Sequence, residues 1–489
     1  MELGGFNPSP LTNLNTGQWQ STLQYAITAG ATTILLQEAV RDPDFVEEYE
    51  AFYSKQQKAV SNLCRRLHFF SLPAPVNAPT KDSADVLAFI DAARKGDYVG
   101  FITLRPLRHA PIGASILKHL PHAPVTCKDE FPVHIAGREF SVSGTPYLQQ
   151  DNAVGACAQA SIWVALRTLR KRLGNSAYSP AELTVAATKH YTFNRVFPGR
   201  DGLTPHQMLE AIRSAGHDPL IIDLNNTQPG ADVRAALAAE KAAPYLDSGL
   251  PVIIGLANPT GGHAVVAIGL GTSTIGNTHP DVLTIHNDNS GCYLDLPLVP
   301  PTPNAYALSQ TIVLIIPLPD GISMTAAEAQ TLAGAAFKFA KPFLIGLPPI
   351  QSLCTSDKAA PIECVLRVFL STRHSFRHWA TEANDIDVAT KITYRTAELP
   401  RFVWVAEIHN KGLFQRGVFT SRSRLGEVIL DASADASHGD GLLFVRLSGL
   451  LMGQDASDDG ILVIERSEST RDVLAVKAPA SLGQQEPWK

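Results

Sequence analysis

The stretch from Gly144 to about Pro317 constrains the fold most, because helical patterns come first along the chain and strand patterns come after them. The helical segments have apolar residues at helical spacing, and the strand-like runs are β-branched and separated by Gly, Pro and Asn turns. The expected helices are 157–172, 180–190, 204–215 and 232–248, and the expected strands are 220–224, 251–256, 263–270, 282–286 and 310–316. Helices followed by an antiparallel sheet are typical of the α+β fold class, which the sequence therefore predicts.

The chain is too long for one ordinary hydrophobic core, since it has 489 residues. Composition shifts and proline-rich breaks divide it into four predicted parts. These are an N-terminal α+β region at 1–143, a central domain at 144–318, a helical connector at 319–345 and a C-terminal α+β domain at 346–489. The patterns indicate no role for the two flanking regions.

Several local patterns in the flanking regions give definite expectations. Residues 42–67 carry acids early and bases late, which complements a helix dipole and predicts one long helix. The β-branched and aromatic run 391–395 predicts a strand. Arg105, Arg108 and His109 form a small basic cluster, which we interpret as a solvated loop.

Composition and charge exclude several classes of function. The net charge is −5 without strong asymmetry, so we expect no nucleic-acid groove and no polybasic membrane surface. No apolar stretch approaches the roughly 18 residues of a membrane span, and the first residues show no secretory signal. The six cysteines include no C-x-x-C pair, which argues against zinc and thioredoxin-type sites and favours a reducing, cytoplasmic compartment. The sequence predicts no metal and no cofactor.

Cys157 lies where a polar loop runs into an amphipathic helix, in the segment QQDNAVGACAQASIW (Gln149–Trp163). The N–H groups and dipole at a helix start favour the thiolate, which is the nucleophilic form of cysteine. Gly155, Ala156 and Ala158 have little bulk, so a substrate carbonyl has room to approach. The alternative is a buried structural thiol, because free cysteine is among the most buried residue types.

Two downstream segments supply partners for a cysteine nucleophile. His263 stands at the start of the strand in GGHAVVAIGL, where it can act as a base. Asn287, or as second choice Asp288, at the end of the strand in LTIHNDNSG, can orient the imidazole. Strand alternation is expected to turn only one of them toward His263. The alternatives are an edge-strand histidine and a plain Asn/Asp turn.

An oxyanion formed on a substrate needs hydrogen-bond donors. Gln150, or else Gln149, is the candidate side-chain donor, together with the backbone N–H of Cys157. A side-chain amide is a neutral donor that does not perturb a thiolate. The alternative is a solvated loop glutamine.

These segments, in this order, resemble the papain-like cysteine peptidases over about residues 144–317, with the bacteriocin-processing, double-glycine leader peptidases the most similar. The segment GLTPHQMLEAIRSAGHDP is similar to the segment that those domains carry between Cys and His. The segment SGLPVIIGL is similar to one of their central strands. In the family the oxyanion glutamine stands where this chain has Asp151, so Gln150 is displaced by one residue. The residue after the cysteine, usually Gly or Trp, is Ala158 here.

The resemblance implies a thiol hydrolase, either a cysteine peptidase or an amidase, that works through a thioester acyl-enzyme. Its expected substrate is a peptide or protein, and the flanking regions are expected to offer surfaces for a protein partner. Two alternatives remain open from the sequence. One is a transglutaminase-like acyltransferase that uses the same site, and the other is a catalytically inactive papain-like binding or scaffold protein.

Overall fold

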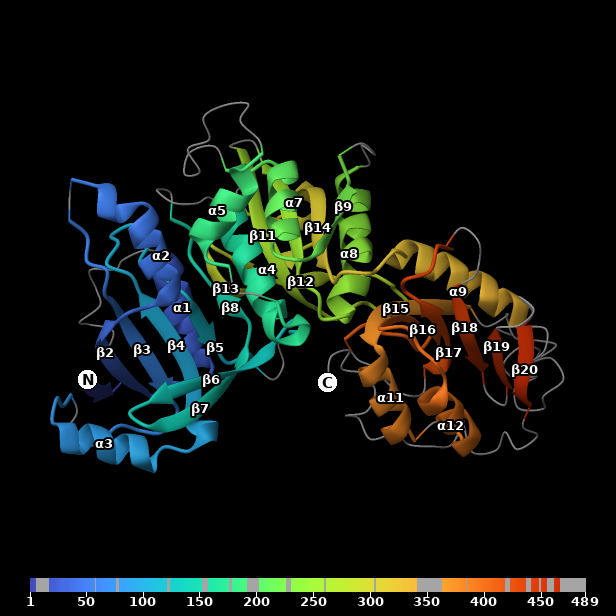
Figure 1. Cartoon of the computed structure of the whole chain (residues 1–489), viewed down its shortest axis with the longest axis horizontal. Coiled ribbons are helices and arrows are strands. Elements are labelled where there is room, and N and C mark those ends of the chain that lie inside the picture. Colours follow the sequence, from blue (N-terminus) through green and yellow to red (C-terminus); the bar gives the residue numbers. More distant parts are fainter. Residues whose placement is uncertain are drawn as a thin grey trace.

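The computed structural model of the chain is a mixed α+β structure with several antiparallel sheets (Figure 1). It describes residues 1–5, 17–57, 59–75, 79–120, 124–151, 157–175, 178–190, 202–225, 230–258, 261–302, 305–340, 363–384, 386–417, 423–436, 441–447, 450–454 and 461–466. Three six-stranded sheets follow one another along the chain, and Figure 1 shows them side by side with the middle sheet between the other two.

The first sheet is built by the N-terminal region and has the strand order β1-β2-β3-β4-β5-β8. Its strands are β1 (Glu2–Gly5), β2 (Thr33–Val40), β3 (Cys64–Phe70), β4 (Tyr98–Leu104), β5 (Ser115–Leu117) and β8 (Pro146–Tyr147). The residues on either side of Gly137 form a hairpin of β6 (Asp129–Ile135) and β7 (Arg138–Gly144). The helices of this region are α1 (Gly17–Thr28), α2 (Pro43–Ala51) and α3 (Ser83–Ala92), with short 3-10 turns η2 (Tyr53–Lys55) and η3 (Lys95–Asp97).

The middle sheet has the order β13-β12-β11-β10-β14-β9, with every pair antiparallel. Its strands are β9 (Asp218–Asp223), β10 (Val252–Asn258), β11 (Gly261–Leu270), β12 (Val282–Asn287), β13 (Gly291–Pro297) and β14 (Thr311–Leu318). Its helices are α4 (Cys157–Leu173), α5 (Pro180–Thr188), α7 (Pro205–Ser214) and α8 (Ala231–Asp247), and η4 (Leu308–Gln310) precedes β14. Ser179 and Thr204 are the N-caps of α5 and α7, where each side-chain oxygen accepts a backbone N–H three residues later.

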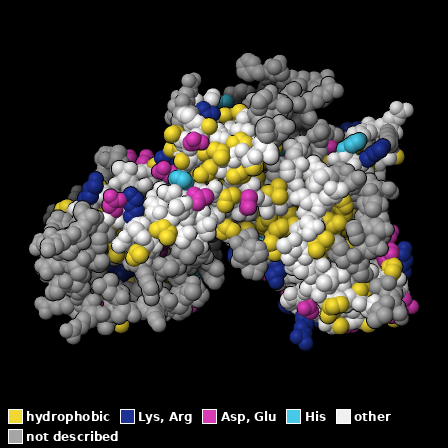
Figure 2. Space-filling view, turned by 180° about the vertical axis from the view of Figure 1, so that it is seen from behind, with side chains coloured by type: hydrophobic (Ala, Val, Ile, Leu, Met, Phe, Trp, Pro, Cys, Tyr) yellow, Lys and Arg dark blue, Asp and Glu magenta, His cyan; other side chains and the backbone are white. Residues whose placement is uncertain are grey.

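The third sheet runs β15-β16-β17-β18-β19-β20 in chain order. Its strands are β15 (Cys364–Thr372), β16 (Phe402–Asn410), β17 (Arg424–Asp431), β18 (Leu442–Leu447), β19 (Leu450–Gln454) and β20 (Ile461–Arg466), and its helices are α9 (Ala326–Ala340), α11 (Arg373–Glu382) and α12 (Val388–Thr396). One cluster of buried apolar side chains runs through all three regions and includes Trp19, Trp163 and Trp404. From behind, hydrophobic side chains gather over the middle of the molecule, between the two outer lobes (Figure 2).

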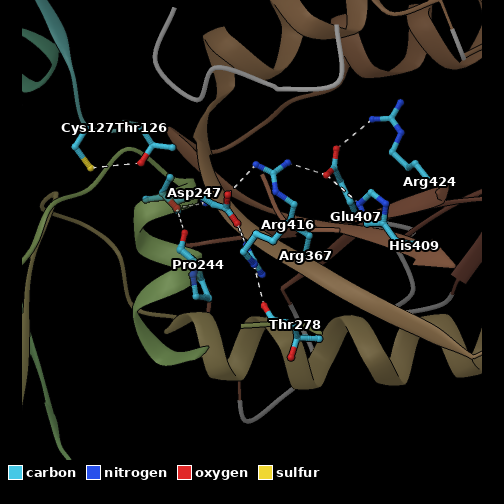
Figure 3. Close-up of polar contacts among 12 residues, drawn as sticks. Thr126, Cys127, Pro244, Asp247, Thr278, Arg367, Glu407, His409, Arg416 and Arg424 are labelled. Atoms are coloured by element: carbon cyan, nitrogen blue, oxygen red, sulfur yellow. Dashed lines mark hydrogen bonds and ion pairs between the residues drawn. The ribbon is translucent and has the colours of Figure 1, made fainter. Parts of the chain in front are cut away.

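A buried network of charges joins α8 of the middle region to the third sheet (Figure 3). Asp247, at the end of α8, accepts hydrogen bonds from Arg416 and, at 3.1 Å, from Arg367 on β15. Arg367 also donates to Glu407 on β16 at 2.8 Å. The Nε of Arg416 donates to Thr278 O, in the loop between β11 and β12, at 2.8 Å. Because these charged groups are buried, each depends on its partners to replace the hydration that it has lost.

Three local expectations are wrong. The helix predicted over 42–67 ends at Ala51, and Cys64 begins the strand β3. The strand predicted at 391–395 is part of the helix α12, whose N-cap Asp387 accepts the N–H of Thr390 at 2.8 Å. Arg105 is only 4% exposed, so it does not belong to a solvated loop.

No helix among the described residues is long and apolar enough to cross a membrane.

Asp247 provides a test of the buried network. Replacing it with Ala leaves Arg367 and Arg416 without their shared carboxylate, so we expect a loss of roughly 3–5 kcal/mol in the free energy of unfolding, measured by urea denaturation. The control is Glu210→Ala, which breaks the 3.1 Å pair with Arg213 on the surface of α7 and should cost less than about 1 kcal/mol. Equal losses in the two variants would show that the network does not hold these regions together.

Candidate functional site

Cys157 is the first residue of α4 and lies where this helix meets β11. The sulfur accepts a hydrogen bond from the backbone N–H of Ala264 at 3.2 Å. One turn further along the helix, Ser161 Oγ donates to Ala264 O at 3.3 Å. The two contacts hold the first turn of α4 against the strand that carries His263. Gly155 and Ala156 lie outside the described residues.

The helix that carries Cys157 is also held by the N-terminal region. Asp44, on α2, accepts a hydrogen bond from Trp163 Nε1 at 3.1 Å and another from Arg167 at 2.7 Å. Trp163 and Arg167 both belong to α4, and Asp44 is mostly buried beside them. The position of the cysteine helix therefore depends on both the first and the middle region, which the sequence did not indicate.

The pairing of β11 with β12 brings His263 to the turn that follows Asn287. Val266 pairs with His286, and the strands are antiparallel, so the start of β11 faces the end of β12. Asn287 Oδ1 is 3.0 Å from His263 Nε2 and also accepts the N–H of Asn289 at 2.9 Å. The orienting contact expected for Asn287 is thus present.

The hydrogen-bond network assigns the tautomer of His263. A side-chain carbonyl oxygen can only accept, so Nε2 carries the hydrogen and Nδ1 keeps a lone pair. Nδ1 lies 3.5 Å from Asn289 Nδ2, at the outer limit of a hydrogen bond. Among the described residues no hydrogen bond joins the Cys157 thiol to this ring. Nδ1 is therefore the ring nitrogen that can accept a proton.

Asp288 approaches the same imidazole. The expectation that only one of Asn287 and Asp288 faces His263 is wrong, because β12 ends at Asn287 and the turn after it brings Asp288 back toward the ring. Asp288 Oδ1 is 3.7 Å from His263 Nε2. Both candidates for the orienting residue therefore lie at the site, one in hydrogen-bond contact and the other at ion-pair distance.

An aromatic ring that the sequence did not single out packs on the imidazole. Tyr306 stacks against His263 with ring centroids 4.7 Å apart and an angle of 27° between the planes. It lies shortly before η4, in the segment that links the edge strand β13 to the inner strand β14 of the middle sheet. Nothing in the surrounding residues NAYAL signals this contact, which arises only from the tertiary fold.

The two candidate glutamines have different surroundings. Gln149 is 3% exposed, and its Oε1 accepts the N–H of Ile112 at 3.1 Å. Its backbone oxygen accepts from Arg105 at 2.8 Å, and Arg105 pairs with Glu48 at 3.0 Å. Gln150, in contrast, donates from Nε2 to Asn289 Oδ1 at 3.2 Å. Gln149 is thus an anchor of the preceding chain, and Gln150 is the glutamine that reaches the turn beside His263.

Burial controls the protonation of the site. Burial raises the pKa of the Cys157 thiol to about 11, and the negative charge of Asp288 raises this pKa further. The N–H groups of Ala264, Ala158 and Cys157 itself lower it, but by less. Burial also lowers the pKa of His263, although its hydrogen bond to Asn287 opposes the change. The thiolate expected from the helix start is therefore outweighed by desolvation, and the site holds a neutral thiol beside a neutral imidazole.

No group of three His, Cys, Asp or Glu side chains within the described ranges is arranged to hold a metal ion. The described cysteines, at 64, 127, 157, 292 and 364, form no disulfide.

Comparisons with known proteins give limited matches. No family model matches the sequence, and no curated protein matches it either. One solved structure that matches is the peptidase domain of Streptococcus ComA, a bi-functional ABC transporter involved in quorum sensing. It is 18% identical in sequence, and the match covers 35% of this chain and 96% of that domain with a TM-score of 0.23. A double glycine motif protease from an AMS/PCAT transporter, in complex with its leader peptide, is 17% identical, over 35% of this chain and 91% of that one, with a TM-score of 0.21.

The different surroundings of the two glutamines predict different effects on stability. Gln149→Ala leaves the buried N–H of Ile112 without its side-chain acceptor, so we expect a loss of roughly 1–3 kcal/mol in the free energy of unfolding. Gln150→Ala removes the contact with Asn289 at the exposed turn and should change that free energy by about 0.5 kcal/mol or less. Urea denaturation measures both. A larger loss for Gln150→Ala than for Gln149→Ala would contradict these assignments.

Proposed function

We propose that the chain is a thiol hydrolase, a cysteine peptidase or amidase, with Cys157 as nucleophile and His263 as base. The observation that carries this proposal is the convergence of three elements. The helix start that bears Cys157 is bonded to the strand residue next to His263, and the Nε2 of His263 is held by Asn287. Together these supply a nucleophile, a base and a group that orients the base.

In the proposed reaction, Nδ1 of His263 takes the thiol proton as the sulfur attacks a substrate carbonyl carbon. The tetrahedral oxyanion is stabilised by the backbone N–H of Cys157 and by the side-chain amide of Gln150. Collapse of this intermediate breaks the bond to the leaving amine, which receives the proton from His263, and leaves a thioester on Cys157. A water molecule, deprotonated by His263, then hydrolyses the thioester.

The electrostatics favour general-base catalysis over a preformed ion pair. The thiol is neutral at rest because its pKa is about 11, so proton transfer to His263 accompanies attack on the substrate. The ring stacking of Tyr306 and the bond to Asn287 support this by keeping the imidazole in one orientation.

We further propose that the middle region has a papain-like arrangement and acts on peptide or protein substrates in a reducing, cytoplasmic compartment. The cysteine helix packed on an antiparallel sheet supports the arrangement. None of the described cysteines forms a disulfide, which supports a reducing compartment.

Two alternatives use the same residues. With an amine as the acceptor in place of water, the thioester would be consumed by acyl transfer. The products separate the two reactions, since hydrolysis leaves a carboxylate and transfer leaves an amide.

The second alternative is an inactive binding module. One observation favours it: Nδ1 of His263, the proposed base nitrogen, contacts Asn289 and not the thiol of Cys157.

The rate of alkylation of Cys157 by iodoacetamide tests the proposed base. At pH 7 we expect His263→Ala to slow the alkylation of Cys157 at least about tenfold, because the thiol then loses its proton acceptor. Peptide mapping by mass spectrometry follows Cys157, with Cys364, which is also half-buried, as the reference thiol within the same protein.

The matched control is His206→Ala, which removes an exposed histidine on α7 and should leave both alkylation rates unchanged. Circular dichroism confirms that each variant is folded. If Cys157 reacts at the same rate in wild type and in His263→Ala, the assignment of His263 as its base is wrong.

A further inference from the structure

Asn289, in the turn after β12, is exposed to solvent and yet contacts three groups of the candidate site. Its Oδ1 accepts a hydrogen bond from Gln150 Nε2 at 3.2 Å, and its Nδ2 lies 3.5 Å from His263 Nδ1. Its backbone N–H donates to Asn287 Oδ1 at 2.9 Å. The side chain of one exposed residue therefore contacts both the proposed oxyanion donor and the proposed base.

The neighbouring hydrogen bonds agree on the orientation of the Asn289 amide. Asn287 Oδ1 can only accept, so Nε2 of His263 carries the ring hydrogen and Nδ1 has a lone pair. Nδ1 can then only accept, and the atom that faces it is the Nδ2 donor of Asn289. The remaining amide oxygen of Asn289 accepts from Gln150. A donor meets an acceptor at each contact from Gln150 to Asn287.

A substrate amide needs the same two contacts in the proposed reaction. Its carbonyl oxygen accepts a hydrogen bond from Gln150, and its nitrogen leaves with a proton from Nδ1 of His263. The carboxamide of Asn289 presents its oxygen to Gln150 and its nitrogen to Nδ1. The match extends to atom type, because neither a carboxylate nor an apolar side chain could make both contacts.

We infer that the carboxamide of Asn289 occupies the place of the scissile amide in the resting site, so that a substrate must displace it. This inference rests on the proposed function, and it names how that site is regulated. The resting site is occupied by the protein's own side chain, which covers the base nitrogen and the oxyanion donor together.

Displacement of Asn289 requires movement of its side chain alone. Rotation about the Cα–Cβ and Cβ–Cγ bonds carries the amide into solvent, while the backbone N–H keeps its bond to Asn287 Oδ1. Because the residue is exposed, water can replace both side-chain contacts. The reactivity of the site is then reduced by the fraction of molecules in which Asn289 is displaced.

Alkylation of Cys157 by iodoacetamide tests this inference in the full-length protein, with Cys364 as the reference thiol. Asn289→Ala removes the carboxamide and keeps the backbone N–H, so we expect the rate at pH 7 to rise at least about threefold. The matched control is Asn277→Ala, at an exposed asparagine in the loop between β11 and β12, which should leave the rate unchanged. Equal rates in wild type and Asn289→Ala would overturn the inference.

The His263→Ala background separates release of the base from simple uncovering of the thiol. Without an imidazole, Asn289 has no base nitrogen to cover, so adding Asn289→Ala should change the alkylation rate by less than about 1.5-fold. A threefold gain in this background as well would mean that Asn289 only shields the sulfur, which contradicts the inference.

NMR titration of His263 gives a second readout that needs no thiol chemistry. In full-length protein carrying Cys157→Ser, Asn289→Ala should raise the pKa of His263 by about 0.5 unit or more, because the N–H of Asn289 stabilises the neutral ring. Asn289→Asp keeps the shape of the side chain but loses this donor, so it should also raise the pKa, and it covers the case in which Asn289→Ala does not fold. An unchanged pKa in the folded variants would refute the inference.

Failure of the proposed function has a different signature from failure of this inference. If His263 is not the base, alkylation of Cys157 does not depend on His263, whatever residue stands at position 289. If only the inference is wrong, His263→Ala still slows alkylation, while Asn289→Ala changes neither the alkylation rate nor the pKa of His263.

Discussion

The packing of α4 against β11 is the contact on which the candidate site depends. The bond from the Ala264 N–H to the sulfur of Cys157 fixes the first turn of the helix beside β11, which carries His263 near its start. The hairpin of β11 and β12 then brings the turn after Asn287 to that histidine. The cysteine lies more than a hundred residues before the histidine, and the histidine lies 24 residues before the amide, yet one helix and two antiparallel strands bring the three together.

Support for this arrangement comes from outside the middle region. Asp44 of α2 holds Trp163 and Arg167 of the cysteine helix, and Arg105 holds the backbone of Gln149 shortly before it. On the other side, the buried charges around Asp247 hold the third sheet to α8. The three regions also share a continuous apolar core, so the flanking regions are part of the structure that positions the site.

The sequence predicted the parts of the fold that local patterns specify. Periodic apolar residues predicted α4 and α8, and β-branched runs between turn residues predicted most strands of the middle sheet. It failed where a local signal had two meanings. The run at 391–395 has strand-forming residues, but Asp387 caps a helix there, and the charge gradient of 42–67 concealed the break between α2 and β3.

The candidate site was predictable to a similar extent. Cys157, His263 and Asn287 could be identified because each stands at the start or end of an element with its own sequence signal. Tyr306 and the structural role of Gln149 could not, since stacking and burial depend on residues distant in the chain. The thiolate expected at the helix start was also missed, because the dipole is a local feature whereas the desolvation that opposes it is set by the whole fold.

Mass spectrometry of protein N-termini tests whether Cys157 and His263 together cleave amide bonds. N-terminal peptides are compared between cells that express wild type, Cys157→Ser, His263→Ala or the surface control His206→Ala. We expect a set of new N-termini in wild type and His206→Ala that is absent from Cys157→Ser and His263→Ala. Identical sets of N-termini in all four would contradict it.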